Sequence, residues 1–359
     1  MVSAGTPTVI EATPAVAKSC AFKFVSVCLE NIKDAERRLL GAIYPNIVET
    51  EVPVSMAKGI IHTISVNNES AEYGTDIPFV LVHGFASGVG LWTKNLAALA
   101  SKRQVYAIDL LGFARSSRPQ FDSDPALSEL QYVQSIEDWR KEMKIEKMVL
   151  CGHSFGAFIS SSYALEHPSR VRHLVLADPW GFAAEPAEAD KKFNIPPWLK
   201  AVGSVVTMFN PLATLRLARS FAPYLVKKLR PDLGSRYGAE DPDAIYDYVY
   251  QCNAQAPSGE IAFRGMMSNF AWAKRPMCHR FGNLDSKVPV TFICGSKSWI
   301  DPTPLYELQA KNTNINIEVQ VVEDAGHHVY ADQPEDFNQA MCELSDLIER
   351  NADLVRDVE

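Results

Sequence analysis

A serine between two glycines is the first residue in this chain that could do covalent chemistry. Ser154 is the centre of the motif Gly-His-Ser-Phe-Gly at residues 152–156, with an apolar run before it and a helix-like run after it. A nucleophilic serine on a sharp strand-to-helix turn needs small neighbours, because its backbone is strained and the two flanks approach closely. The context therefore predicts Ser154 as a nucleophile, although the motif alone also occurs in ordinary turns.

A serine hydroxyl needs a base within hydrogen-bond reach and a third group that orients this base. The chain order nucleophile, acid, histidine places the base near the C-terminus, where His327 and His328 follow Gly326 after an apolar run. A loop after the last strand can carry a histidine over the nucleophile. We expect His327, directly after the glycine, to be the base, and His328 to be a neighbour that packs or forms a hydrogen bond.

The acid is the least determined member of this set. In most proteins with this arrangement an aspartate follows the glycine after the penultimate strand by about three residues; here the glycine is Gly295 and Ser298 occupies that position. Asp301 is the nearest carboxylate, and we predict it as the acid. Asp178, at the end of the preceding strand, is the reserve candidate; its alternative role is a cap or turn residue beside Pro179.

Acyl transfer to a serine also builds a tetrahedral oxyanion, which needs preorganised N–H donors. In this arrangement one donor follows the nucleophile and the other lies in the loop after the first core strand. We therefore expect the backbone N–H groups of Phe155 and Phe85 to form the oxyanion hole. The segment from Asp109 to Ser117 is typical of a turn-forming loop with buried hydrogen bonds, so a structural role is expected for it.

Strand-like segments that alternate with helical patterns would position these residues. The predicted strands are Ile47–Val54, Ile60–Val66, Phe79–Val82, Gln104–Ile108, Lys147–Cys151, His173–Ala177, Val288–Cys294 and Ile315–Val322, and helical patterns include Leu130–Met143 and Ala157–His167. The first two strands are expected to pair as a hairpin. Apolar strands that alternate with helices predict an α/β fold with a mostly parallel central sheet and helices on both faces. Chemistry in such sheets gathers beyond the carboxyl ends of the strands.

The alternation breaks in the second half of the chain, which suggests how the chain is divided. Residues 1–45 are expected to be an N-terminal extension with an amphipathic helix, which either packs on the domain or lies on lipid. Residues 46–182 and 286–359 would form the two parts of the α/β core. Residues 183–285 lack strand signals and contain prolines that punctuate helices, which predicts an inserted helical cap.

Composition excludes several other classes of protein. The 359 residues carry a formal net charge of −8, and 47% of them are hydrophobic, so a large core is possible and a nucleic-acid partner is disfavoured. The seven cysteines lack metal-ligand spacing, so we expect no disulfide scaffold, no metal site and no cofactor. No apolar run is long enough to span a membrane, and thiols that stay reduced fit a cytoplasmic protein.

The cap sequence favours contact with lipid. Between Asn194 and Pro231 there is no Asp or Glu, whereas six basic residues alternate with apolar ones in this otherwise acidic chain. Basic and apolar helices of this kind suit a surface with anionic head groups, or a pocket for an acyl chain with a phosphate at its mouth. The alternative is a cap helix whose apolar side packs on the core while its basic residues are solvated.

Several motifs together resemble one lipid-directed branch of the α/β-hydrolase-domain proteins. In the core they are His83–Phe85, Asp109–Ser117, Gly152–Gly156, Asp178–Phe182 and His327–Pro334, and in the cap Asn210–Leu212, Asn253–Gln255 and Pro257–Glu260. The resemblance extends from about residue 47 to the C-terminus. This branch comprises the lysophospholipase that acts on N-acyl-phosphatidylethanolamine and the lipid-droplet coactivator of adipose triglyceride lipase, which is also proposed to acylate lysophosphatidic acid.

The resemblance implies an α/β-hydrolase fold and a serine hydrolase or acyltransferase of lysophospholipids or N-acyl phospholipids, with acyl-CoA as the donor in an acyl transfer. Such an enzyme would act in phospholipid and triglyceride homeostasis. The alternative function is a coactivator that recruits or activates a triglyceride lipase on lipid droplets. That type has asparagine at the nucleophile position, whereas this chain keeps Ser154. Both functions imply a cytoplasmic protein that binds lipid droplets or intracellular membranes peripherally.

The branch also has a His-x-x-x-x-Asp pattern that is linked to acyl transfer, and His327 and Asp332 match it here. The residues themselves favour a more modest role for Asp332. It precedes Pro334, which is well placed to open a helix, so Asp332 is expected to help cap that helix.

Overall fold

The computed structural model describes residues 28–66, 72, 77–186, 211–237, 240–268 and 272–356. Its centre is one eight-stranded sheet with the strand order β1-β2-β4-β3-β5-β6-β7-β8. The strands are β1 (Ile47–Pro53), β2 (Ile60–Val66), β3 (Phe79–Val82), β4 (Val105–Ile108), β5 (Met148–His153), β6 (Val171–Ala177), β7 (Val290–Gly295) and β8 (Ile317–Val322). β1 pairs with β2 and β2 with β4 in antiparallel fashion, and the six strands from β4 to β8 run parallel.

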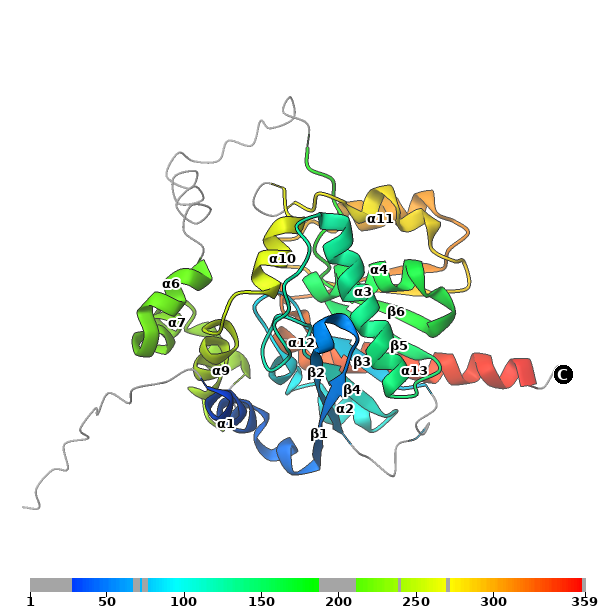
Figure 1. Ribbon diagram of the computed structural model, residues 1–359. Helices are drawn as coiled ribbons and strands as arrows, with labels where there is room; N and C mark the ends of the chain where they lie inside the picture. The colour runs from blue at the N-terminus through cyan, green and yellow to red at the C-terminus, as the bar shows by residue number, and fades with distance from the viewer. Residues whose placement is uncertain are drawn as a thin grey trace, which may run out of the picture.

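Helices cover both faces of the sheet (Figure 1). α3 (Pro125–Glu142), α4 (Phe155–Glu166) and α11 (Thr303–Lys311) pack on one face, while α2 (Leu96–Ala100) and α13 (Pro334–Arg356) pack on the other. The strands between them are apolar on both sides: in β3, Val80 and Val82 join the first core, and Phe79 and Leu81 join the second. The mostly parallel sheet with helices on both faces that the sequence predicts is therefore confirmed.

Between β6 and β7 the described residues form helices joined by loops, and their strand-like pairing is limited to one isolated bridge between Met267 and Ala273. Its helices are α6 (Pro211–Ala218), α7 (Ala222–Leu229), α8 (Asp232–Tyr237), α9 (Ala244–Asn253) and α10 (Gly259–Met266). In Figure 1, α6, α7 and α9 lie to the left of the sheet, and α10 lies above it near α3. The first part of the predicted cap, residues 187–210, lies outside the described residues, and so does the N-terminal segment 1–27. The exact division at residues 45, 182 and 285 stays a prediction.

The amphipathic helix near the N-terminus packs against protein. α1 (Leu29–Leu40) buries Ile32 and Leu39 and lies beside α9 of the cap. Its Arg38 guanidinium forms ion pairs of 2.7 Å with Asp241 and 2.8 Å with Asp247. The helix therefore packs on the domain, which is the first of its two predicted roles, and does not lie free for contact with lipid. None of the helices in the described ranges combines the length and apolar character needed to cross a membrane.

A buried group of charges joins α1 to the sheet. The Glu36 carboxylate, which is 1% exposed, lies 2.6 Å from the Arg115 guanidinium and 3.3 Å from Nε2 of His62. Nδ1 of His62 lies 3.0 Å from the Glu51 carboxylate. Burial alone would lower the pKa of His62, but hydrogen bonds to Glu36 and Glu51 outweigh burial and raise the pKa to about 10. His62 is therefore protonated at neutral pH and neutralises these carboxylates together with Arg115.

This pKa shift predicts a pH-dependent contribution of His62 to stability. Because the folded-state pKa exceeds the ordinary value of 6.5, the contribution is complete below pH 6.5 and is lost as the pH rises through about 10. Urea unfolding measures the free energy of unfolding of wild type and of His62→Gln. The difference between the two, on the order of a few kcal/mol at pH 6.5, should therefore shrink towards pH 10. His173→Gln is the matched control: burial lowers the pKa of His173 to about 3, so its effect should stay constant over this range.

Candidate active site

Ser154 occupies the turn between β5 and α4, as the sequence predicts. Its backbone has φ 52° and ψ −115°, a strained conformation for a residue with a side chain. The flanking glycines make the turn possible, because a Cβ on Gly152 would collide with the backbone of Gly156. A Cβ on Gly156 would in turn collide with the carbonyl oxygens of Val82 and His83 in the neighbouring β3 segment. The turn projects the hydroxyl beyond the carboxyl ends of the parallel strands.

His327 lies on the loop between β8 and α12 (Val329–Asp332) and reaches Ser154 across the sheet edge. Its Nε2 is 3.0 Å from the Oγ of Ser154, and its Nδ1 is 2.5 Å from Oδ2 of Asp178. Because the carboxylate accepts a hydrogen bond from Nδ1–H, the tautomer leaves Nε2 without a proton, and Nε2 can accept the proton of the serine hydroxyl. Serine, imidazole and carboxylate therefore form one hydrogen-bonded chain with the geometry of a nucleophile, its base and an orienting acid.

The structure corrects the predicted acid. Asp178, the reserve candidate, follows β6, is 0% exposed and contacts His327. Its carboxylate also accepts hydrogen bonds from the Gly295 N–H at 3.3 Å and the Ser298 hydroxyl at 2.5 Å. Asp301 does not reach the histidine; it is exposed, and its Oδ1 accepts from the Thr303 N–H at the start of α11. The loop after β7 was expected to supply the acid itself, but it supplies the Ser298 hydroxyl, which donates to the Asp178 carboxylate.

The loop after β3 lies directly beside the nucleophile. A Cβ on Gly84 would come within 3.2 Å of the Cβ of Ser154, so the next residue, Phe85, is close to the reacting hydroxyl. Phe155 is the first residue of α4, and N–H groups in the first turn of a helix have no partner within the helix. Both positions are compatible with the predicted oxyanion donors, which remain a proposal. The ring of Phe85 stacks on Phe263 of the cap at 4.4 Å between centroids.

Two further imidazoles and an indole surround His327: His328, which was expected to pack beside it, and His153 and Trp299, for which no role was predicted. Nε2 of His153 donates to the carbonyl oxygen of His327 at 2.9 Å, and its burial beside two other imidazoles holds the His153 pKa well below the ordinary value. Burial lowers the pKa of His328, which packs against His327, to about 3. Trp299, which is 62% exposed, has its ring 5.2 Å from that of His327. The position of His153 beside Ser154 in the motif was the one sequence signal available for it.

Asp332 does not cap the helix that begins at Pro334. It is the last residue of α12, and its Oδ2 accepts the Gly326 N–H at 2.8 Å. Its Oδ1 lies 2.7 Å from Nε of Arg236 in cap helix α8. The predicted helix-capping role is therefore wrong, because the carboxylate turns back towards the loop that carries His327. A role in acyl transfer stays untested.

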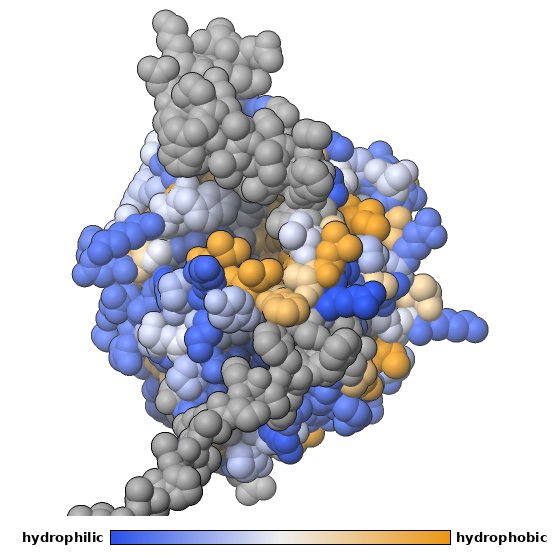
Figure 2. Space-filling model, turned by 90° about the vertical axis from the view of Figure 1, so that its left-hand side faces the viewer, coloured by the Kyte–Doolittle hydropathy of each residue, from blue (hydrophilic) through white to orange (hydrophobic). Residues whose placement is uncertain are grey.

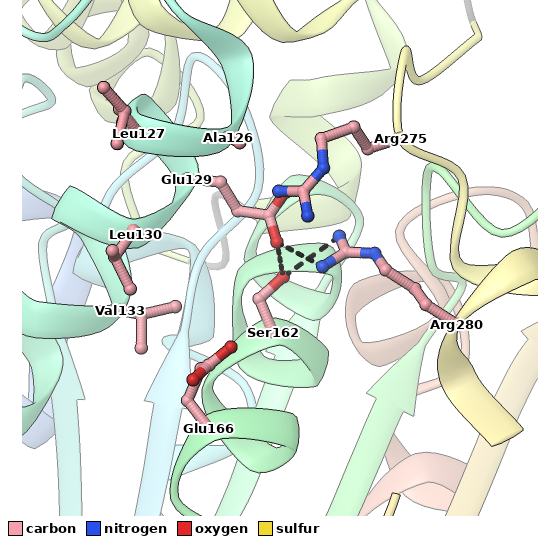
Figure 3. Close-up of a pocket in the computed structure, with 9 residues that line it drawn as sticks. All are labelled: Ala126, Leu127, Glu129, Leu130, Val133, Ser162, Glu166, Arg275 and Arg280. Atoms are coloured by element: carbon pink, nitrogen blue, oxygen red, sulfur yellow. Dashed lines mark hydrogen bonds and ion pairs between the residues drawn. The ribbon is translucent and has the colours of Figure 1, made fainter. Parts of the chain in front are cut away.

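Two other features of the described chain are structural. Asp109 accepts backbone N–H groups of Val89 at 2.8 Å and Arg115 at 3.0 Å, which fits the role expected for its loop. A groove beside α3 and α4 is shown in Figure 3, where Glu129 accepts from Ser162 and from two arginines. Its lining residues are Ala126, Leu127, Glu129, Leu130, Val133, Ser162, Glu166, Arg275 and Arg280. These ion pairs connect the last part of the inserted segment to the core helices.

Known proteins are similar to this chain in sequence and in fold. A family model described as alpha/beta hydrolase fold matches residues 77–334. The chain is 43% identical over 320 residues to 1-acylglycerol-3-phosphate O-acyltransferase ABHD5 of Sus scrofa, covering 89% of this chain and 90% of that protein. It is 42% identical over 323 residues to the (lyso)-N-acylphosphatidylethanolamine lipase of Homo sapiens, covering 89% and 93%.

Among solved structures, a bacterial membrane phospholipase A described as a virulence factor superposes with a TM-score of 0.63 at 21% identity, over 89% of this chain and 91% of that one. Naproxen esterase of Bacillus subtilis superposes with a TM-score of 0.60 at 18% identity, over 88% and 95%. At this level of identity the two structures show a shared fold.

The position of Asp178 predicts a sharp difference between two aspartate variants. Asp178→Asn should slow the labelling of Ser154 by a fluorophosphonate probe by a factor on the order of 10⁴, because the amide favours the wrong imidazole tautomer. Asp301→Asn, the matched control, should label at nearly the wild-type rate, because that carboxylate only accepts the Thr303 N–H. The reverse order of rates would show that Asp178 does not orient the base.

Proposed function

Because this chain belongs to the α/β-hydrolase fold family and to its branch of lipid-directed proteins, we propose that it is a serine hydrolase or acyltransferase of acyl lipids. Ser154 would be the nucleophile, His327 the base and Asp178 the orienting acid. One observation carries the proposal: the unbroken hydrogen-bonded chain from the Ser154 Oγ through the imidazole to the Asp178 carboxylate.

The reaction follows from these contacts. Nε2 of His327 accepts the hydroxyl proton as the Oγ of Ser154 attacks the acyl carbonyl carbon, and Asp178 stabilises the imidazolium that forms. The N–H groups of Phe85 and Phe155 would stabilise the oxyanion. The imidazolium then protonates the leaving group, which is an alcohol or amine from a lipid and the thiol of CoA from an acyl-CoA donor, and its departure leaves an acyl-serine. Attack by water on that intermediate gives hydrolysis, whereas attack by the hydroxyl of a lysolipid gives acyl transfer, from an acyl-CoA donor in that case.

The relatives support a phosphate-bearing acyl lipid as the substrate. One relative is named for acyl transfer to 1-acylglycerol-3-phosphate and another for hydrolysis of (lyso)-N-acylphosphatidylethanolamine. Both names describe an acyl chain joined to a head group that carries phosphate. A site of this kind needs apolar walls and basic groups near its entrance. Phe85, Phe263 and Trp180 supply aromatic surface beside the nucleophile turn.

The outer face of the cap supports work at a lipid surface. Along α6 and α7, Leu217 is 83% exposed and Leu229 is 79% exposed, with Phe221 between them also exposed. Exposed basic side chains lie along the same helices, including Lys228 and Arg230. Figure 2 shows apolar residues gathered around a hollow on the face towards which these helices lie. Exposed apolar and basic groups on one face suit anionic membranes or lipid droplets, so we place the protein peripherally on such surfaces in the cytoplasm.

Replacing the nucleophile tests the catalytic part of the proposal. Ser154→Ala removes the attacking oxygen, so fluorophosphonate labelling should disappear and turnover of lysophospholipids and N-acyl phospholipids should fall by a factor on the order of 10⁶. The measurements are gel detection of the labelled protein and mass spectrometry of a lipid panel with purified protein. Ser123→Ala, which removes the hydroxyl of an exposed serine before α3, is the control and should retain labelling.

The same variant distinguishes the enzyme from a coactivator. A protein that only recruits or activates a triglyceride lipase on lipid droplets does not require the hydroxyl of Ser154. Undiminished stimulation of a partner lipase by Ser154→Ala, together with no lipid turnover by wild type, would refute the enzyme and support the coactivator.

Binding to vesicles tests the cap face. The double variant Leu217→Ser, Leu229→Ser should bind vesicles of phosphatidylcholine and phosphatidylserine at least about tenfold more weakly in sedimentation, because each buried leucine contributes about 1.5–3 kcal/mol. Leu127→Ser, Leu347→Ser is the control, since these leucines are also exposed, at 50% and 45%, but lie on α3 and α13. Equal binding by the two variants would remove the cap face from the proposal.

A further inference from the structure

The loop that carries His327 is fixed by three backbone groups. On one side, the carbonyl oxygen of His327 accepts a hydrogen bond from Nε2 of His153 at 2.9 Å. On the other side, the N–H of Gly326 donates to Oδ2 of Asp332 at 2.8 Å. The carbonyl of His328 accepts the N–H groups of Ala331 and Asp332 as α12 begins. The direction of the imidazole therefore depends on a carboxylate five residues further along the chain.

That carboxylate is itself held by the cap. The side chain of Asp332 is 8% exposed, and its Oδ1 is paired with Nε of Arg236 at 2.7 Å. Arg236 belongs to α8 and also lies 3.3 Å from Asp232 on the same helix. Each carboxylate oxygen of Asp332 thus serves a different partner: one contacts the catalytic loop of the core, and the other contacts the cap.

We propose that Arg236 and Asp332 are positioning residues, which hold the His327 loop in register with Ser154 and make this register depend on where cap helix α8 lies. The proposal rests on the proposed function, because it concerns the same nucleophile and base. Asp332 acts through the backbone of the loop and does not touch the acyl group. Its contact with that loop is the hydrogen bond from the N–H of Gly326.

Electrostatics explain why both residues are needed. A carboxylate that is almost fully buried is costly unless a positive charge and hydrogen bonds compensate for its lost hydration. Without Arg236, Asp332 would turn towards water and release the Gly326 N–H, which is one residue from the imidazole. A displacement of the base by about 1 Å is enough to slow an aligned reaction by roughly 10²-fold. The cap thus influences the reaction without contributing an atom to it.

The link extends to the exposed part of the cap. α8 begins two residues after Arg230, at the end of α7, and the Arg230 guanidinium pairs with Asp232 at 2.8 Å. Asp232 also pairs with Arg236. A continuous series of charges therefore runs from the surface of α7 through α8 to the loop of His327.

The rate of covalent labelling of Ser154 by a fluorophosphonate probe tests this proposal, because it reports alignment without requiring a lipid. The variants are Arg236→Met, Asp332→Asn and their double variant, with Arg264→Met, an exposed arginine of α10, as the control. Labelling rates are measured over a range of probe concentrations and normalised to the folded fraction from urea unfolding. Arg236→Met should lower the maximal rate by roughly 10–10²-fold and leave the half-saturating probe concentration unchanged.

Two further results complete the test. Arg236→Lys should recover most of the rate, because it restores the positive charge beside Asp332. The double variant should be no slower than the slower single variant, because both substitutions break one linkage. If Arg236→Met does not fold, Asp332→Asn provides the comparison instead.

The possible failures are distinguishable. If wild type itself does not react with the probe, the proposed function fails. If wild type reacts, and Arg236→Met and Asp332→Asn each react as fast as wild type per folded molecule, the positioning role is wrong while the proposed function stands. The positioning role would also be overturned if the double variant lost rate by the product of the two single losses and Arg236→Lys labelled no faster than Arg236→Met.

Discussion

The hydrogen bond between the Asp178 carboxylate and Nδ1 of His327 is the interaction on which the candidate site depends. It fixes which nitrogen of the imidazole faces Ser154, and it requires three loops to meet at one edge of the sheet. Asp178 is fully buried, so its charge is tolerable only because a backbone N–H, a hydroxyl and an imidazole all donate to it. The parallel strands supply this convergence, since their carboxyl ends lie side by side.

Most of the sheet and two of the three residues in this chain of hydrogen bonds could be predicted from the sequence. Apolar runs bounded by glycine and proline identify the strands, and the glycines around Ser154 are required by close backbone contacts that any such turn must make. The acid could not be assigned in the same way. β6 and β7 are parallel neighbours, with Ala177 opposite Ile293, so a carboxylate after either strand reaches the same point. Spacing along the chain does not distinguish the two positions, whereas the buried contacts of Asp178 do.

Local patterns also failed where a side chain had competing partners far away in the sequence. Asp332 has the position of a helix cap, yet its carboxylate contacts Arg236 and Gly326, because a buried pairing with a guanidinium is stronger than an exposed bond to a helix N–H. The stripe of α1 is equally suited to a membrane or a protein surface, and contacts within the folded protein, such as those of Arg38 with α9 and the preceding loop, separate the two. Amphipathicity predicts that a face is covered but does not identify what covers it.

Such long-range contacts also relate the cap to the chemistry. A serine enzyme with a preformed triad could react with any acyl compound that reaches it, so selectivity must come from what surrounds the triad. In this chain the inserted segment contributes to these surroundings: Phe263 stacks on the ring of Phe85, and Arg236 pairs with Asp332. The helices that present exposed apolar and basic side chains are continuous with α8. The proposed contact with lipid and the proposed alignment of the base would therefore involve the same structural element. Binding to lipid can then speed the reaction only if lipid stabilises the arrangement in which α8 holds the His327 loop, because a ligand favours a conformation only when it binds that conformation more tightly.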